Sequence, residues 1–104
     1  MMIKTKKETC YRVTIEEVTA DQEVGKTLQF EFEDREDVFN VVDKLKQGSG
    51  LDDATATKMG VALRLLGPVM MINRKHPLFA DFMPHFKTFM QNLKSTVKAA
   101  VKDK

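Results

Sequence analysis

The sequence predicts a single α+β domain in which a two-stranded antiparallel hairpin packs on three helices, in the order ββααα. Three observations support this class. The chain has 104 residues, which is enough for one hydrophobic core but not for two. Two short stretches near the N-terminus alternate apolar and polar residues, as half-buried strands do. Three later stretches repeat their apolar residues every three to four positions, as amphipathic helices do.

The two alternating stretches are residues 11–16 (YRVTIE) and 28–33 (LQFEFE). Their apolar positions hold β-branched and aromatic side chains, which favour strands. One face of the predicted hairpin carries Tyr11, Val13, Ile15, Leu28, Phe30 and Phe32. Because a two-stranded hairpin is marginally stable alone, we expect helices to cover this face. Residues 19–26 predict a long, mobile loop between the strands, with Gly25 at its positive-φ position.

The three helices are expected near residues 34–47, 53–73 and 84–101. Asp34 is the expected N-terminal cap of the first helix, and Gly48 is its expected stop. Pro68 interrupts the pattern of the second helix, so a kink or a break is expected there. Pro84 suits the first position of the third helix, because its missing N–H would have no partner within that helix.

The composition is that of an ordinary globular domain, with 42% hydrophobic and 31% charged residues. The longest apolar run, residues 65–72, falls far short of the ~20 residues that span a bilayer. The first ten residues contain lysines with no apolar segment after them, so no secretory signal is expected. The single cysteine, Cys10, excludes an internal disulfide framework, and these features together favour the cytoplasm. We expect residues 1–9 to be flexible, residues 10–101 to form the domain and residues 102–104 to fray.

No cluster of residues in the sequence predicts catalysis or metal binding. Asp81 and His85 are four residues apart, but Pro84 interrupts the helix that would align them as metal ligands. Cys10 could pair with a histidine only if a third group oriented that histidine, and the sequence offers no such group. Residues 48–50 (GSG) lack the lysine of a phosphate-binding loop. We therefore assign no catalytic, cofactor-binding or metal-binding residues, and nothing in the sequence supports an enzyme.

The stretch NRKHPLF, residues 73–79, has a structural and a functional interpretation. In the structural interpretation, Asn73 ends a helix and Pro77 starts a short turn. Leu78, Phe79 and Phe82 then close the end of the core. This interpretation accounts for every residue, and we favour it. In the functional interpretation, the segment contributes to an interaction surface. The candidate residues for that surface are Met71, Ile72, Arg74, Lys75 and His76.

Three stretches of the chain resemble a known family. They are YRVTIEE (residues 11–17), LQFEFEDREDVF (residues 28–39) and the pattern LG-x-VM…NRKHPLF (residues 66–79). Together they resemble the domain of unknown function 3861, a family of small bacterial proteins, over residues 11–93. The resemblance implies a bacterial source and an α+β domain. It implies no activity, and it carries over no catalytic residue. Members of the family usually have an acidic residue where this chain has Pro68.

The charges are distributed unevenly along the chain. Residues 1–52 hold 8 Lys/Arg and 12 Asp/Glu, a net charge of −4, whereas residues 53–104 hold 9 and 3, a net charge of +6. A basic half can bind nucleic acid, but the chain has no Trp and its phenylalanines lie on apolar stripes, so stacking platforms are missing. Internal methionines can line an adaptable apolar surface instead. The sequence thus predicts a protein-interaction or regulatory module with no membrane partner, either a homodimer or bound to an unidentified protein. The alternative is weak nucleic-acid binding through the basic C-terminal half.

Overall fold

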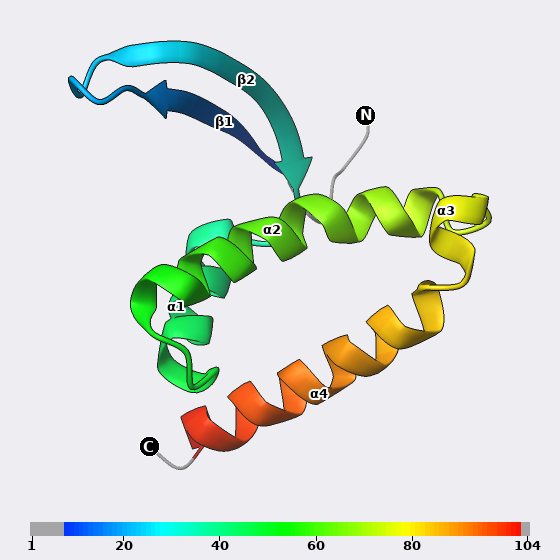
Figure 1. The fold of residues 1–104 in the computed structure, drawn as a ribbon. Coiled ribbons are helices and arrows are strands. Elements are labelled where there is room, and N and C mark those ends of the chain that lie inside the picture. The colour runs from blue at the N-terminus through cyan, green and yellow to red at the C-terminus, as the bar shows by residue number, and fades with distance from the viewer. Residues whose placement is uncertain (1–7, 103–104) are drawn as a thin grey trace, which may run out of the picture. The chain divides into compact units, whose positions relative to one another are not determined.

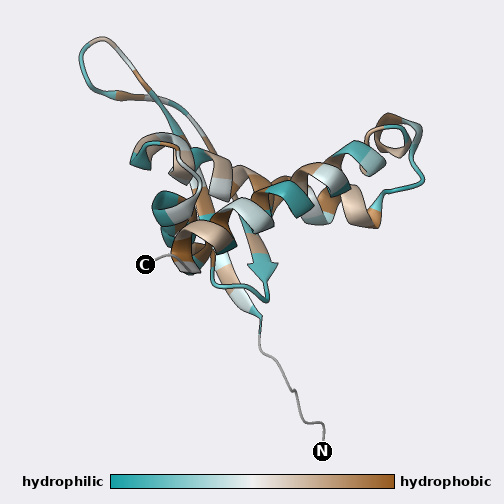
Figure 2. Cartoon of the chain, turned by 90° about the horizontal axis from the view of Figure 1, so that it is seen from below, coloured by the Kyte–Doolittle hydropathy of each residue, from teal (hydrophilic) through white to brown (hydrophobic). Residues whose placement is uncertain are grey.

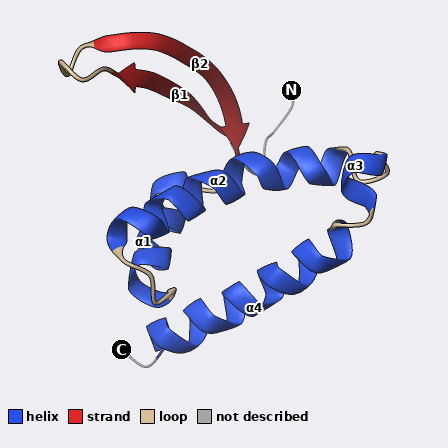
Figure 3. Cartoon of the chain, in the orientation of Figure 1, coloured by secondary structure: helices blue, strands red, loops and turns tan. Residues whose placement is uncertain are grey.

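The computed structural model describes residues 8–102 of the chain, in which two antiparallel strands precede four helices (Figure 1). The predicted α+β class is therefore confirmed, with one helix more than expected. The expectations for residues 1–7 and 103–104 lie outside the described residues. The chain forms two compact units. We call residues 8–37 the hairpin unit and residues 38–102 the helical unit. Figure 3 distinguishes the strands of the first from the helices of the second.

The hairpin unit consists of β1 (Thr9–Val18) and β2 (Val24–Asp34), which pair antiparallel. The register places Tyr11 opposite Phe32, Val13 opposite Phe30 and Ile15 opposite Leu28. All six predicted apolar residues therefore share one face, which we call the hairpin apolar face. On the other face, the Arg12 guanidinium lies 2.8 Å from the Glu31 carboxylate, directly across the strands. The alternation in the sequence thus predicted both the strands and their pairing.

The connection between the strands is shorter and more ordered than predicted. It spans only residues 19–23, and the Gln22 N–H donates a hydrogen bond of 2.9 Å to the Thr19 carbonyl. The positive-φ residue is Gln22, at 66°, and not Gly25. The predicted long loop is wrong because a register irregularity at Glu17 lets both strands continue toward the turn. The Glu17 carboxylate accepts a 3.0 Å hydrogen bond from the Lys26 N–H and lies against Gly25, where a side chain would collide with it.

Helix α1 (Val38–Gly48) begins four residues later than predicted. Asp34 ends β2 and is buried, and its carboxylate accepts a 3.0 Å hydrogen bond from the Glu36 N–H. The carboxylate therefore closes a local turn instead of capping the helix, which is why the expected cap is wrong. Gly48 is the last residue of α1, near the predicted stop. It also allows close approach to α4, because a Cβ there would lie 3.0 Å from the Cα and carbonyl oxygen of Val97.

Helix α2 (Asp53–Ile72) begins as predicted, with Asp52 at the N-terminal cap accepting a 3.1 Å hydrogen bond from the Thr55 N–H. Hydrogen bonds from the Thr55 side chain, and then from its backbone, lower the pKa of the Asp52 carboxyl. The helix runs unbroken through Pro68, so the predicted break does not occur. Gly67 removes one obstacle to this continuity, because it lacks the Cβ that the ring of a following proline would strike in a helical conformation, although Pro68 still lacks the N–H of a helical hydrogen bond.

Two further helices complete the helical unit. They are α3 (Pro77–Ala80), a single helical turn where the sequence predicted a short turn at Pro77, and α4 (Met83–Lys102), which starts one residue before the predicted Pro84. Helix α1 packs against both α2 and α4, and α3 links those two helices at the end remote from α1 (Figures 1 and 3). Among the described residues, the buried hydrophobic side chains are Val38, Leu45, Ala56 and Met70. The core of the helical unit is therefore small, with Val38 and Leu45 on α1, Ala56 at the start of α2 and Met70 near its end.

The close approach at Gly48 gives a first test of this packing. In Gly48→Ala, the new methyl group would meet backbone atoms of Val97, which cannot rotate away as a side chain could. We expect a loss of ~1–3 kcal/mol in the free energy of unfolding, measured by urea denaturation. The control is Gln47→Ala, an exposed position on the same helix, which should change stability by less than ~0.5 kcal/mol. Equal effects of the two substitutions would contradict the predicted helix contact.

Candidate interaction surface

The described residues expose large apolar side chains on both the strands and the helices. No group of three or more His, Cys, Asp or Glu side chains within residues 8–102 could hold a metal ion. Cys10 has an exposed, free thiol at the start of β1. Within the same residues, none of the helices combines the length and the hydropathy that a membrane crossing requires. The surface around residues 71–76 therefore becomes the first candidate.

The NRKHPLF segment does end one helix and begin another. The backbone N–H and the side-chain amide of Asn73 both donate to the Val69 carbonyl, at 3.1 and 2.8 Å. Asn73 has a φ of −107°, so it ends α2 without the left-handed conformation considered for it. His76 has an extended backbone and caps α3, with its Nδ1 accepting a 3.0 Å hydrogen bond from the Leu78 N–H. The structural interpretation is therefore confirmed for Asn73, His76 and Pro77.

The predicted burial at the end of the core is wrong for Leu78 and for Phe82, which is 47% exposed. The Leu78 side chain is 72% exposed, and Phe79 is only half-buried beside the His76 ring, at a centroid distance of 6.0 Å. The physical reason is the position of α3, a single turn at the end of the helical unit remote from α1. All five candidate residues, Met71, Ile72, Arg74, Lys75 and His76, are exposed. The structure thus places them together around one helix end, and their predicted role in an interaction stays a prediction.

A larger set of exposed apolar side chains extends from this helix end. We call it the helical apolar surface, and it consists of Leu66, Val69, Ile72, Leu78, Phe82 and Phe89. These residues lie on the second half of α2, on α3, on the connection after α3 and on the first half of α4. The sequence analysis predicted amphipathic helices with a buried face and did not identify this surface as a whole. The available signal was the run LLGPVMMI, residues 65–72, which is apolar on every side of the helix although only Met70 is buried.

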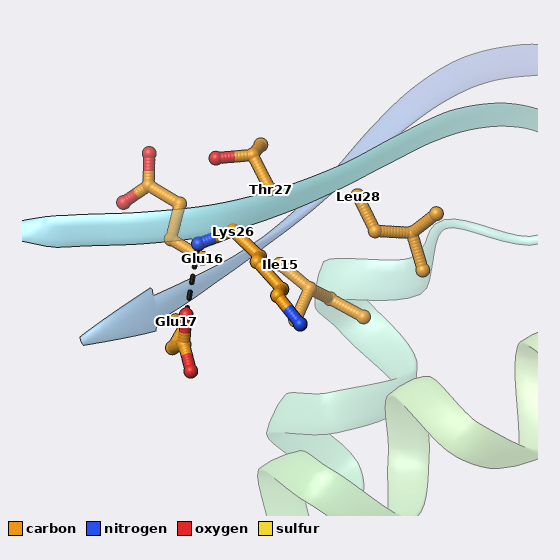
Figure 4. A pocket seen from close by; sticks show the side chains of 6 residues that line it. All are labelled: Ile15, Glu16, Glu17, Lys26, Thr27 and Leu28. Atoms are coloured by element: carbon orange, nitrogen blue, oxygen red, sulfur yellow. Dashed lines mark hydrogen bonds between the residues drawn. The ribbon is translucent and has the colours of Figure 1, made fainter. Parts of the chain in front are cut away.

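The hairpin apolar face is also exposed toward the turn. Ile15 and Leu28, which face each other across the strands, are 54% and 59% exposed. They border an open hollow of about 270 Å³. Its lining consists of Ile15, Glu16, Glu17, Lys26, Thr27 and Leu28 (Figure 4). The Glu17 carboxylate in this hollow is hydrogen-bonded to the Lys26 backbone, so it contributes to the turn structure (Figure 4).

The two units carry opposite net charges. The unit that contains the hairpin, residues 1–37, holds 6 Lys/Arg and 10 Asp/Glu, a net charge of −4. The unit that contains the helices, residues 38–104, holds 11 Lys/Arg and 5 Asp/Glu, a net charge of +6. Hydrophilic and hydrophobic segments are interleaved along the helices (Figure 2). The boundary between the units therefore separates the charges as the midpoint of the sequence does.

Comparison with known proteins agrees with the resemblance seen in the sequence. The family described as a domain of unknown function with a solved structure, domain of unknown function 3861, matches residues 9–95. A crystal structure of a protein of unknown function from Pectobacterium atrosepticum is 37% identical, with a TM-score of 0.75, and the match covers 86% of this chain and 99% of that one. No curated protein gives a significant match. Because the family match spans most of its length, this chain belongs to the domain of unknown function 3861 family.

Proposed function

We propose that this chain is a non-enzymatic interaction module of the cytoplasm that works as a homodimer. The observation that carries the proposal is the second half of α2, which is apolar on every side and still largely exposed. A helix of this kind is normally enclosed by protein. The cytoplasmic location rests on the single, exposed cysteine, because free thiols stay reduced there.

A second copy is the partner that fits this surface. Helix α4 presents a stripe of apolar side chains, Phe86, Met90, Leu93 and Val97, all of them half-buried. Interfaces between permanently paired subunits resemble a domain core cut in half. The half-buried side chains of this stripe have that character. Monomers rarely expose apolar patches above a few hundred Å², and each phenylalanine alone can bury ~150–250 Å². Self-association supplies matching apolar surface without requiring any other protein.

The polar border of the surface suits an interface as well. Arg74 and Lys75 are exposed between Asn73 and His76, the two residues whose side chains cap helices. Neither cation has a capping role, so both can contact a partner without weakening the helix ends. Charges at an interface border mainly set the specificity and the rate of association.

The homodimer can be tested with a single charged substitution. Ile72 is 81% exposed, so Ile72→Asp should leave the folded monomer intact while placing an unpaired carboxylate in the interface. We expect sedimentation velocity to show a dimer for the wild type at micromolar concentration and a dissociation constant at least ~100-fold weaker for the variant.

The matched control is Phe39→Asp. Phe39 is 76% exposed on α1 and lies outside the helical apolar surface, so its substitution should leave the dimer unchanged. Circular dichroism of each variant separates loss of association from loss of folding. A wild-type chain that stays monomeric at all concentrations up to ~100 μM would reject the homodimer.

Weak nucleic-acid binding is the second candidate, and the net charge of +6 on the helical unit favours it. If it occurs, a gel shift with generic DNA and RNA at low salt should show retardation that disappears near physiological salt. Replacing Arg74 and Lys75 together by alanine should weaken the shift uniformly across sequences, since phosphate contacts do not read bases. The absence of any shift at low salt would reject this candidate.

A further inference from the structure

We propose that the dimer forms by reciprocal exchange: the hairpin apolar face of one copy covers the helical apolar surface of the other, and the reverse contact forms at the same time. This inference rests on the homodimer proposed above and specifies which surfaces meet. Two-fold symmetry makes such an arrangement self-consistent, because every contact between residue i and residue j occurs twice. The reciprocal dimer encloses the hairpin apolar face and the helical apolar surface of each copy.

Charge complementarity favours this pairing over contact between two helical surfaces. The unit with the hairpin, residues 1–37, carries a net charge of −4 and the unit with the helices, residues 38–104, a net charge of +6, so their approach is attractive, whereas two helical units would repel each other. The hairpin also needs the contact for stability, because a two-stranded sheet with an uncovered apolar face is marginal in water. A dimer through the helical surfaces alone would leave Ile15 and Leu28 exposed.

The complementarity is strongest at two short segments. The hairpin turn, residues 16–23 (EEVTADQE), holds four carboxylates and no Lys or Arg, and each of the four residues is exposed. The segment NRKH, residues 73–76, holds two exposed cations and no carboxylate. Exposed apolar residues adjoin each segment: Ile15 and Val24 flank the turn, and Ile72 and Leu78 flank NRKH. Each surface therefore combines an apolar patch with charge of a single sign, and the signs are opposite.

The effect of salt distinguishes the two ways of building the dimer. For reciprocal exchange, the dissociation constant from sedimentation equilibrium should rise at least about tenfold between ~50 and ~500 mM NaCl, as salt screens the attraction. For a dimer through two helical surfaces, the same salt should screen a repulsion and lower the constant. A dimer that tightens in salt would overturn the exchange and leave the homodimer standing. A wild-type monomer would overturn both.

A charge swap tests the exchange at the residues themselves. One variant reverses the charge of the turn with Asp21→Lys and Glu23→Lys. A second reverses the charge of NRKH with Arg74→Glu and Lys75→Glu. Each should weaken the dimer at least about tenfold. A chain that carries all four substitutions should recover most of the wild-type affinity, because the reversed segments match again. Lys44→Glu, on α1, is the control for a change in net charge alone. Failure of the four-substitution chain to recover, with all variants folded by circular dichroism, would overturn the exchange.

Discussion

The short length of α1 is the constraint on which the rest of the structure depends. Helices α2 and α4 have 20 residues each, roughly 30 Å, whereas α1 has 11, roughly 16 Å. Helix α1 packs against both long helices, so it can cover only about half of each. Val38, Leu45 and Ala56 are buried on α1 or at the start of α2, whereas Met70 is the one buried hydrophobic residue of the described chain on the second half of α2. The homodimer that we propose is a response to this mismatch in length.

The strands and their faces were predictable from sequence because a period of two places alternate residues on one face. The register was not, because a slip of two residues leaves the faces unchanged; the structure pairs Tyr11 with Phe32, whose rings stack at 5.4 Å. The cap at Asp52 was predictable for a similar reason, as it depends only on the following turn. Asp34 was not, because a carboxylate at a strand end can close a turn or cap a helix with the same local sequence. The continuity of α2 through Pro68 depended on the identity of the preceding residue, which a rule about proline alone overlooks.

The candidate surface was only partly predictable. The exposure of residues 71–76 followed from their place at and just after the end of a helix, but the exposure of Leu78 and Phe82 did not. Large apolar residues after a helix end normally indicate a core, and a sequence alone does not show whether a covering element exists. The run at residues 65–72 contained the missing information. A helix that is apolar on every side needs neighbours on every side, and the four helices of one chain do not provide them.

In the segment NRKH, two residues cap helices and the two residues between them do not. Asn73 and His76 use neutral side-chain groups to satisfy backbone at the end of α2 and the start of α3. Arg74 and Lys75, between them, take no part in the helix caps described above. A cation near the last turn of a helix is favoured by the helix dipole, but by only ~0.3–1 kcal/mol. This stabilisation by the helix dipole does not require two cations. It also does not explain why the two cations adjoin exposed Ile72 and Leu78. A partner surface that is both apolar and acidic explains the cations and the apolar residues together, and the hairpin unit is a part of the same chain with those properties.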